Sequence, residues 1–273
     1  MTCAPQSAAD PERWLWRLRP DTAQASVTLV VMPHAGGSAQ SFAPWAGWLP
    51  MNWNARVAQY PGRGARFGEP PAETVEELAD ELARALLTID GPVAIFGHSL
   101  GGLVGFETAW RLQEAGRPVV GFVASASTPP QLFKAAIAPA QPISDDQLLS
   151  QLRQRGGLPA DVMEHPDLLE MIFEILRSDI RLLDRYEMRD TVRRLASPVT
   201  AIGGADDPVT TPQKLAQWQA RSRDAIRSHV LSGGHFYIEN HAEALSSIFE
   251  NELTRWMDNA FDGKASECTR SAA

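Results

Sequence analysis

Short apolar runs alternate with helical periodicity along most of this sequence, and the alternation constrains the fold more than any other feature. Runs with the character of strands are Val27–Met32, Arg56–Gln59, Val93–Phe96, Val119–Val123 and Val199–Ile202, with Ser228–Leu231 as a shorter candidate. Several of these runs are apolar at consecutive positions, which is typical of strands covered by helices on both faces. The sequence therefore predicts an α/β fold with a mainly parallel sheet and flanking crossover helices.

Helices are expected between these strands, because apolar residues recur there at intervals of three or four. The expected helices span Glu73–Ile89, a segment that begins after Gly102, and about His241–Met257. The residues beyond Phe261 are small and polar, and we expect them to be frayed. We predict one domain over residues 14–260, with flexible ends at residues 1–13 and 261–273.

One connection is longer than a crossover requires. Residues 128–197 form a connection of about 70 residues, whereas a parallel crossover usually needs only a dozen or more. Ser144 and Gln147 have the spacing of a capping box, followed by a helix that stops at Gly156-Gly157, and a second helix is expected to start after Pro166. We expect this insertion to form a helical lid over one edge of the sheet; the alternative is a fixed helical layer.

Composition excludes several classes of protein. The 273 residues include 25 Lys and Arg against 33 Asp and Glu, a net charge of −8, and no basic run suited to nucleic acid occurs. The two cysteines, Cys3 and Cys268, lie in the expected tails and cannot build a disulfide framework or a cysteine-based metal site. No apolar run approaches the roughly 20 residues of a membrane helix, and we find no signal peptide. We expect a cytoplasmic protein with no metal or cofactor of its own.

The strongest chemical signal is the motif Gly97-His98-Ser99-Leu100-Gly101. It lies between an expected strand and an expected helix, where a G-x-S-x-G motif forms a sharp turn that exposes a nucleophilic serine. The glycines are needed because side chains two residues away on either side would collide in this strained turn. We expect Ser99 to be the nucleophile; the alternative is a glycine-rich turn with an incidental serine.

A serine hydroxyl needs a base within hydrogen-bond reach. His235 follows a short strand and Gly233-Gly234, at the carboxyl end of the sheet, which is the expected place for a triad histidine. His98 is adjacent to Ser99 and should point away from it, in a structural role. The remaining histidines outside the Pro33–Gly37 loop are expected to pack or face solvent: His165, His229 and His241.

The acid must hold His235 in one tautomer and stabilise the imidazolium that forms during attack. Asp206 and Asp207 both follow the strand Val199–Ile202, and both fit a Gly-x-x-Asp spacing. Asp207 precedes Pro208, which favours extended backbone at the end of the strand. We favour Asp207, and Asp206 is the alternative.

Attack on a carbonyl also requires N–H donors for the oxyanion. The residue after the nucleophile supplies one of them, the backbone N–H of Leu100. The loop Pro33-His34-Ala35-Gly36-Gly37 follows an earlier strand, and its glycines allow a close approach to substrate. We expect Ala35 to be the second donor, and the alternative is a loop that is only flexible.

Taken together, these motifs resemble a known family. The segments concerned are Pro33–Ser38, Tyr60–Gly64 with Arg66, Phe96–Gly101 with Phe106-Glu107, Asp207-Pro208 and Gly234–Phe236. In this order they resemble the type II thioesterases of polyketide synthases and nonribosomal peptide synthetases, over about residues 14–257. The resemblance implies an α/β-hydrolase fold with a helical lid, and it supports Asp207 because Asp before Pro is the usual triad acid of the family.

The same resemblance implies that the protein is an editing enzyme, which hydrolyses acyl thioesters from the phosphopantetheine arm of acyl or peptidyl carrier proteins. Since such carriers are typically acidic, we expect a basic surface near the pocket, with Arg63, Arg66, Arg181 and Arg185 as candidates. We expect a monomer. The alternatives are a small-molecule carboxylesterase on the same fold, and a catalytically silent carrier-binding protein.

Overall fold

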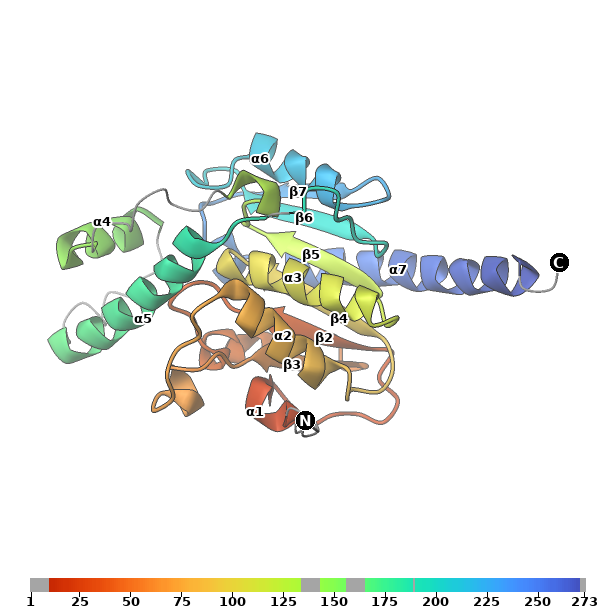
Figure 1. Cartoon of the computed structure of the whole chain (residues 1–273), viewed down its shortest axis with the longest axis horizontal. Coiled ribbons are helices and arrows are strands. Elements are labelled where there is room, and N and C mark those ends of the chain that lie inside the picture. The colour runs from red at the N-terminus through yellow and green to blue at the C-terminus, as the bar shows by residue number, and fades with distance from the viewer. Residues whose placement is uncertain (1–9, 134–142, 156–164, 189, 271–273) are drawn as a thin grey trace, which may run out of the picture.

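A computed structural model describes residues 10–133, 143–155, 165–188 and 190–270 of the chain, and their strands form one seven-stranded sheet (Figure 1). The strand order is β1-β3-β2-β4-β5-β6-β7, and all neighbours are parallel except β1 and β3. The predicted α/β fold with a mainly parallel sheet is therefore confirmed. The strands are β1 Leu15–Arg17, β2 Val27–Met32, β3 Trp53–Ala58, β4 Val93–His98, β5 Gly121–Ser125, β6 Val199–Gly204 and β7 Arg227–Leu231.

The bounds of some strands match those predicted from the sequence, and the bounds of others differ by a few residues. β2 has the bounds that were predicted, whereas β3 begins at Trp53 and β5 continues to Ser125. The ends of β5 follow from pairing, since Gly121 lies opposite Ala94 of β4 and Ser125 lies opposite Ile202 of β6. β1 was not predicted, because three residues carry no measurable periodicity.

Helices precede, separate and follow the strands along the chain. They are α1 Pro11–Trp14, η1 Ala39–Gly47, η2 Gly64–Arg66, α2 Val75–Leu86, α3 Leu100–Glu114, η3 Pro130–Leu132, α4 Asp145–Arg155, α5 Pro166–Arg185, α6 Pro212–Ala216, η5 Gln217–Arg221, η6 Tyr237–Glu239 and α7 Ala242–Arg270. The last helix is longer than predicted, so the backbone of residues 261–270, expected to be frayed, is helical. Cys3 lies outside the described residues, and Cys268 belongs to α7.

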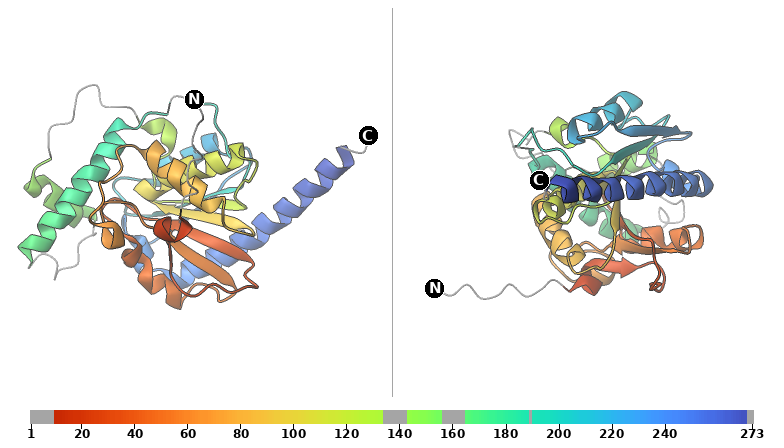
Figure 2. Two further views of the ribbon diagram at one scale, coloured as in Figure 1. Left: turned by 60° about the horizontal axis from the view of Figure 1, so that its bottom comes forward. Right: turned by 90° about the vertical axis from the view of Figure 1, so that its right-hand side faces the viewer.

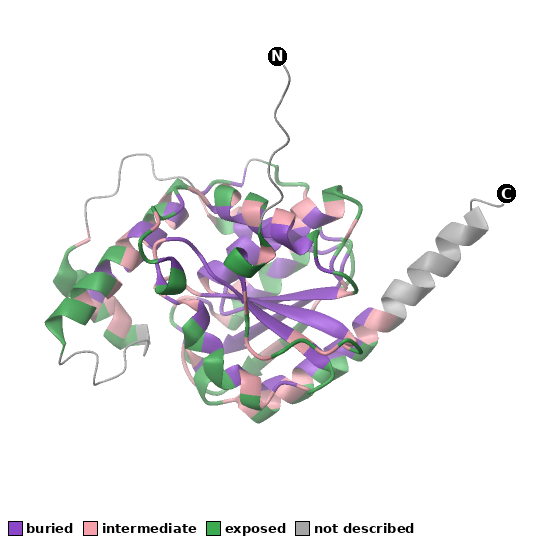
Figure 3. Cartoon of the chain, turned by 90° about the horizontal axis from the view of Figure 1, so that it is seen from below, coloured by how far each residue is buried: buried purple, intermediate pink, exposed green. Residues whose placement is uncertain are grey.

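Both faces of the sheet are covered, as the apolar strands required. Along β2, Val30 and Met32 belong to a buried cluster with residues of α2 and α3, while Leu29 and Val31 belong to a second cluster with η1 and α7. Figure 2 shows the helices on either side of the sheet, and Figure 3 shows that its central strands are buried. The second cluster holds Trp45 and Trp53 beside Phe249, and Trp48 packs against it.

The described part of the long connection between β5 and β6 contains η3, α4 and α5, and α4 and α5 lie at the carboxyl end of the strands (Figure 1). The predicted capping box is present: Ser144 N donates to Gln147 Oε1 at 3.0 Å, and Gln147 N donates to Ser144 Oγ at 3.3 Å. α5 begins at Pro166, close to the predicted start. The predicted stop at Gly156-Gly157 lies outside the described residues.

Two further properties concern the residues that the structure describes. None of the helices there combines the length and apolar content that crossing a membrane requires. In the same parts of the chain, no three His, Cys, Asp or Glu side chains gather into a group that could hold a metal ion.

Candidate active site

Ser99 lies on a strained turn between β4 and α3. Its φ of 55° and ψ of −117° are rare for a residue with a side chain, and its backbone N–H donates to Ser125 O at 2.8 Å. A Cβ atom at Gly97 would overlap the carbonyl oxygen of Gly101, and one at Gly101 would overlap that of Met32. The crowding that was expected to require both glycines is therefore present, and the turn holds Ser99 at the N-terminus of α3.

The structure brings together the three side chains that the sequence selected. His235, in the loop after β7, has Nε2 at 3.0 Å from Ser99 Oγ. Its Nδ1 lies 2.8 Å from Asp207 Oδ2, in the loop after β6. Because β4, β6 and β7 are parallel, their carboxyl ends meet at one edge of the sheet, and residues far apart in sequence converge there.

The choice between the two neighbouring aspartates follows from these contacts. Asp207 is buried, and its Oδ1 accepts the backbone N–H of Val209 at 2.8 Å while Oδ2 faces His235. Asp206 is exposed, and its backbone N–H donates to Gly233 O at 2.9 Å. The carboxylate that contacts the imidazole is that of Asp207, the one favoured from the sequence.

The two expected oxyanion donors lie on segments that pack together. Leu100 is the first residue of α3, where backbone N–H groups have no partner within the helix. The loop that holds Ala35 follows β2, and the ends of β2 and α3 are so close that Gly101 has no room for a side chain beside Met32 O and Pro33 O. Among the hydrogen bonds of the described residues, the N–H groups of Ala35 and Leu100 have no protein acceptor.

Comparison with known proteins identifies the family. A family model for the thioesterase domain matches residues 27–253. The chain belongs to the thioesterase domain family. This thioesterase is 35% identical over 254 residues to the "Probable cadicidin biosynthesis thioesterase" of Streptomyces griseus, a match that covers 93% of this chain and 68% of that protein.

Solved structures agree with this assignment. The thioesterase is similar to the type II thioesterase BorB from the borrelidin biosynthetic cluster, with a TM-score of 0.79, 32% identity, and coverage of 91% of this chain and 100% of that one. It is also similar to RedJ from the prodiginine pathway of Streptomyces coelicolor, with a TM-score of 0.75, 31% identity, and coverage of 93% and 96%. The resemblance to type II thioesterases is confirmed, and the chain is a serine hydrolase on the α/β-hydrolase fold.

The electrostatics of the thioesterase favour a charged Asp207 and a fixed imidazole tautomer. Burial alone would raise the pKa of Asp207, but His235 and the backbone N–H groups of Val209 and Thr210 outweigh it and hold the pKa below its usual value. A carboxylate can only accept, so His235 Nδ1 carries the proton of that contact. In the neutral ring, Nε2 is then free to accept a proton from Ser99 Oγ.

Two further histidines line the site, and both are held neutral. His98 is buried, with Nδ1 at 2.8 Å from Ser125 Oγ, and burial lowers the pKa of its ring well below the usual value. This confirms the structural role expected for it. No role at the site was predicted for His34, although its place in the loop after β2 indicated that it lies near the carboxyl end of the sheet. Burial lowers its pKa to about 4, and its ring packs edge-on against His98 and Phe236.

The remaining histidines lie apart from this cluster. His165 precedes α5 and is exposed, and His229 lies in β7. His241 is half-buried, with Nε2 at 2.8 Å from Ser232 O. Each has the packing or surface environment expected from the sequence.

Two of the four arginines proposed for a basic surface are not on the surface. Arg63 is 3% exposed and forms an ion pair with Asp179, and Arg66 is 6% exposed, with Glu69 as its partner. Those two predictions were wrong. Inside the protein, a carboxylate far away in sequence neutralises Arg63, and one three residues away neutralises Arg66. Arg181 and Arg185, on α5, are exposed as expected.

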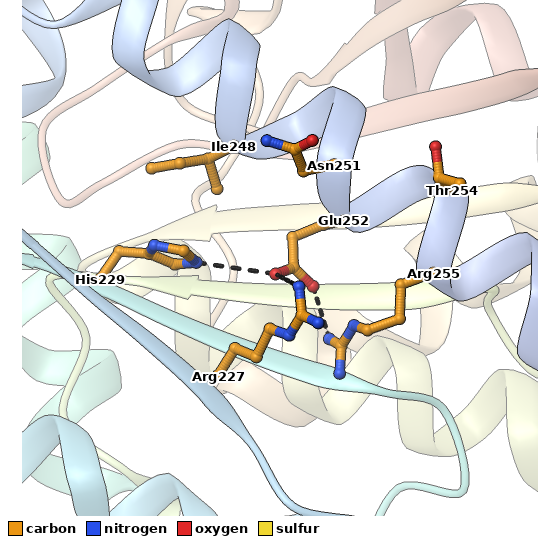
Figure 4. A pocket seen from close by; sticks show the side chains of 7 residues that line it. All are labelled: Arg227, His229, Ile248, Asn251, Glu252, Thr254 and Arg255. Carbon is orange, nitrogen blue, oxygen red and sulfur yellow. Dashed lines mark hydrogen bonds and ion pairs between the residues drawn. The ribbon is translucent and has the colours of Figure 1, made fainter.

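Two cavities lie outside the triad. One of about 520 Å³ is lined by Arg227, His229, Glu252 and Arg255 among others, and Figure 4 shows the basic side chains directed toward Glu252. Burial would raise the pKa of Glu252, but contacts with His229, Thr200 and Arg255 hold it at about 2. The contacts of Glu252 connect α7 with β6 and β7. The other cavity, of about 420 Å³, is lined by residues of the loop around His235, and Ser99 lines neither.

Proposed function

We propose that the thioesterase is an editing enzyme that removes acyl groups from the phosphopantetheine arm of acyl or peptidyl carrier domains. The observation that carries the proposal is the continuous contact from Ser99 Oγ through the His235 ring to the Asp207 carboxylate, in a chain of this family. The similarity to type II thioesterases supports a substrate presented as a thioester on a carrier.

In the first half of the reaction, Ser99 Oγ attacks the thioester carbonyl carbon while His235 Nε2 accepts the hydroxyl proton. The distance of 3.0 Å between these atoms supports direct transfer. The negative charge passes to the carbonyl oxygen, where the N–H groups of Ala35 and Leu100 donate to it. Asp207 stabilises the imidazolium without taking its proton.

The tetrahedral intermediate then collapses. The carbon–sulfur bond breaks, the sulfur takes the proton from His235, and the acyl group remains as an ester on Ser99. A thiol, with an ordinary pKa of about 8.5, needs less help from the acid than an alkoxide does. Water activated by His235 hydrolyses the ester and releases the carboxylic acid, so the reaction uses no cofactor of the protein itself.

The carrier protein is expected to approach the edge of the sheet where the triad lies. An acidic carrier would be attracted by exposed cations there, and Arg181 and Arg185 on α5 remain candidates for this contact after the correction of Arg63 and Arg66. Arg185 also lies 3.9 Å from Glu73, so its charge is partly shared. We propose that the protein acts as a monomer in the cytoplasm.

The test is mass spectrometry of an acyl-loaded carrier protein, incubated with the wild type, with Ser99→Ala, and with Ser247→Ala. Ser247 is an exposed serine on α7 and serves as the matched control. Wild type and Ser247→Ala should remove the acyl group, whereas Ser99→Ala should leave it in place. Equal loss with Ser99→Ala would reject nucleophilic catalysis by this serine.

A second arm distinguishes the thioesterase from a carboxylesterase, because the triad geometry serves both reactions. The rates on an acyl-pantetheine thioester and on the oxygen ester of the same acyl group are compared. A clear preference for the thioester supports the proposal, and equal kcat/KM values would favour the carboxylesterase. A wild type that binds the loaded carrier and releases no acid on either substrate would favour the silent binding protein.

A further inference from the structure

Helix α5 of the insertion reaches the loop that holds Ala35. Asp179 Oδ2 accepts the backbone N–H of Gly36 at 2.8 Å. One turn earlier on the same helix, Leu176 lies so close to Gly36 that a Cβ atom there would stand 2.8 Å from Leu176 Cδ2. Ala35 itself packs against the small cluster formed by Leu148, Phe173 and Leu176 of α4 and α5. The insertion and the loop are therefore in direct polar and apolar contact.

The Asp179 carboxylate is held by Arg63. Two hydrogen bonds of 2.6 Å join the guanidinium to the two carboxylate oxygens, and the side chains are 3% and 0% exposed. Arg63 also donates to Gly37 O at 3.4 Å. Burial would lower the pKa of the guanidinium, but Asp179 outweighs it and raises that pKa. A bidentate pair leaves the carboxylate a single geometry, with Oδ2 directed at Gly36.

The peptide group between Ala35 and Gly36 is thereby held at both ends. A carbonyl oxygen can only accept, so His34 Nδ1 donates to Ala35 O across 2.9 Å. On the other side, the Gly36 N–H donates to Asp179. Gly36 has a φ of +77°, which a flexible glycine would leave readily without such contacts. The orientation of this peptide determines the ψ angle of Ala35, and the Ala35 N–H is the expected oxyanion donor.

A buried ion pair is weak evidence for a role in stability alone, because apolar residues of similar volume often stabilise a fold equally well. The pair here connects three segments far apart in sequence: the loop after β2, the loop after β3, and α5. We infer that Asp179, fixed by Arg63, is a positioning residue that sets the Ala35–Gly36 peptide, so that the seating of α5 determines the placement of the oxyanion donor. This inference rests on the proposed function.

Two double variants separate positioning from stability. Arg63→Met with Asp179→Leu replaces the pair by apolar side chains and removes the acceptor for Gly36. Arg63→Met with Asp179→Asn also removes both charges, but an amide oxygen remains for the Gly36 N–H. The two proteins differ only in Leu or Asn at one position, and each Tm is measured first, to compare folded enzymes.

Kinetics use an acyl-N-acetylcysteamine thioester, which needs no carrier docking. The Leu-containing variant should lose about 10- to 100-fold in kcat with little change in KM, because a displaced oxyanion donor weakens binding of the transition state more than of substrate. A trifluoromethyl ketone inhibitor forms an oxyanion adduct with Ser99, and its affinity for this variant should fall by a similar factor. The Asn-containing variant should keep kcat within about threefold of the wild type.

A Leu-containing variant that is folded and has wild-type kcat would overturn the inference, as would equal kcat losses in the two variants. If neither variant folds, hydrogen exchange of the wild type decides: the Gly36 amide should be protected, and exchange at the rate of a free peptide would refute the contact. Failure of the proposed function is distinguishable, since the wild type itself would then leave the thioester intact.

Discussion

Replacing Asp207 by Asn should nearly abolish activity, and the structure shows why the isosteric change is so damaging. Asp207 Oδ1 accepts the Val209 N–H at 2.8 Å, while Oδ2 accepts from His235 Nδ1. In the variant, the amide oxygen stays toward Val209. The flipped amide would place its NH₂ group against the Val209 N–H, and two donors facing each other cost about 1–3 kcal/mol. The amide NH₂ group then faces His235 Nδ1, which must become an acceptor.

The imidazole consequently carries its proton on Nε2, directed at Ser99 Oγ, and it cannot accept the hydroxyl proton. A wrong tautomer in a serine triad lowers kcat by about 10⁴-fold, equivalent to about 5 kcal/mol of transition-state stabilisation. The assay is kcat/KM on an acyl-pantetheine thioester for Asp207→Asn and for Asp206→Asn, its exposed neighbour. Asp206→Asn should stay within about twofold of the wild type, as surface substitutions usually do. A loss of less than tenfold for Asp207→Asn, or a larger loss for Asp206→Asn, would refute the reasoning.

Other substitutions test the fold around the site. Glu252→Gln should lower the free energy of unfolding at pH 7 by about 1–3 kcal/mol and reduce its pH dependence. Since the folded pKa of about 2 lies below the ordinary 4.5, this stabilisation is present above pH 4.5 and is lost as the pH falls toward 2. Urea unfolding of this variant and of exposed Glu250→Gln checks it; equal effects would contradict it. Gly101→Ala should misfold or lose activity in a thioester assay, because its Cβ overlaps Met32 O; a fully active protein would show that the turn relaxes. Phe249→Ala should cost about 3–5 kcal/mol in urea unfolding, since the ring is 1% exposed.

The turn around Ser99 could be predicted because its requirements are local. A strand, two glycines around a serine, and a helix occupy consecutive positions, and steric crowding links each residue to the geometry. His235 was predictable for a related reason: it follows a strand that ends at the same edge of the sheet as β4. In a parallel sheet, residues that follow the strands lie at the same edge, so a residue's position after a strand predicts where it lies in the fold.

Other features depended on contacts that a linear reading does not contain. Asp206 and Asp207 have equivalent spacing from the preceding glycines. Pro208 and the family resemblance favoured Asp207, but which carboxylate reaches His235 depends on the burial and orientation of the loop. Arg63 was assigned to the surface because the partner that neutralises it, Asp179, lies on another segment 116 positions away. Long-range ion pairs have no sequence period, so the burial of an arginine is decided by a residue that spacing cannot identify.

The charges around Ser99 also explain why a proton would pass to only one of three neighbouring imidazoles. The ring centroid of His98 lies 5.3 Å from that of His235, and His34 packs against His98. With a pKa of about 4, only about one His34 ring in a thousand is protonated at pH 7, and burial keeps the pKa of His98 low as well. His235 alone has a carboxylate partner, Asp207. Neutral neighbours therefore add no repulsion when His235 becomes cationic, and the positive charge forms where Asp207 stabilises it.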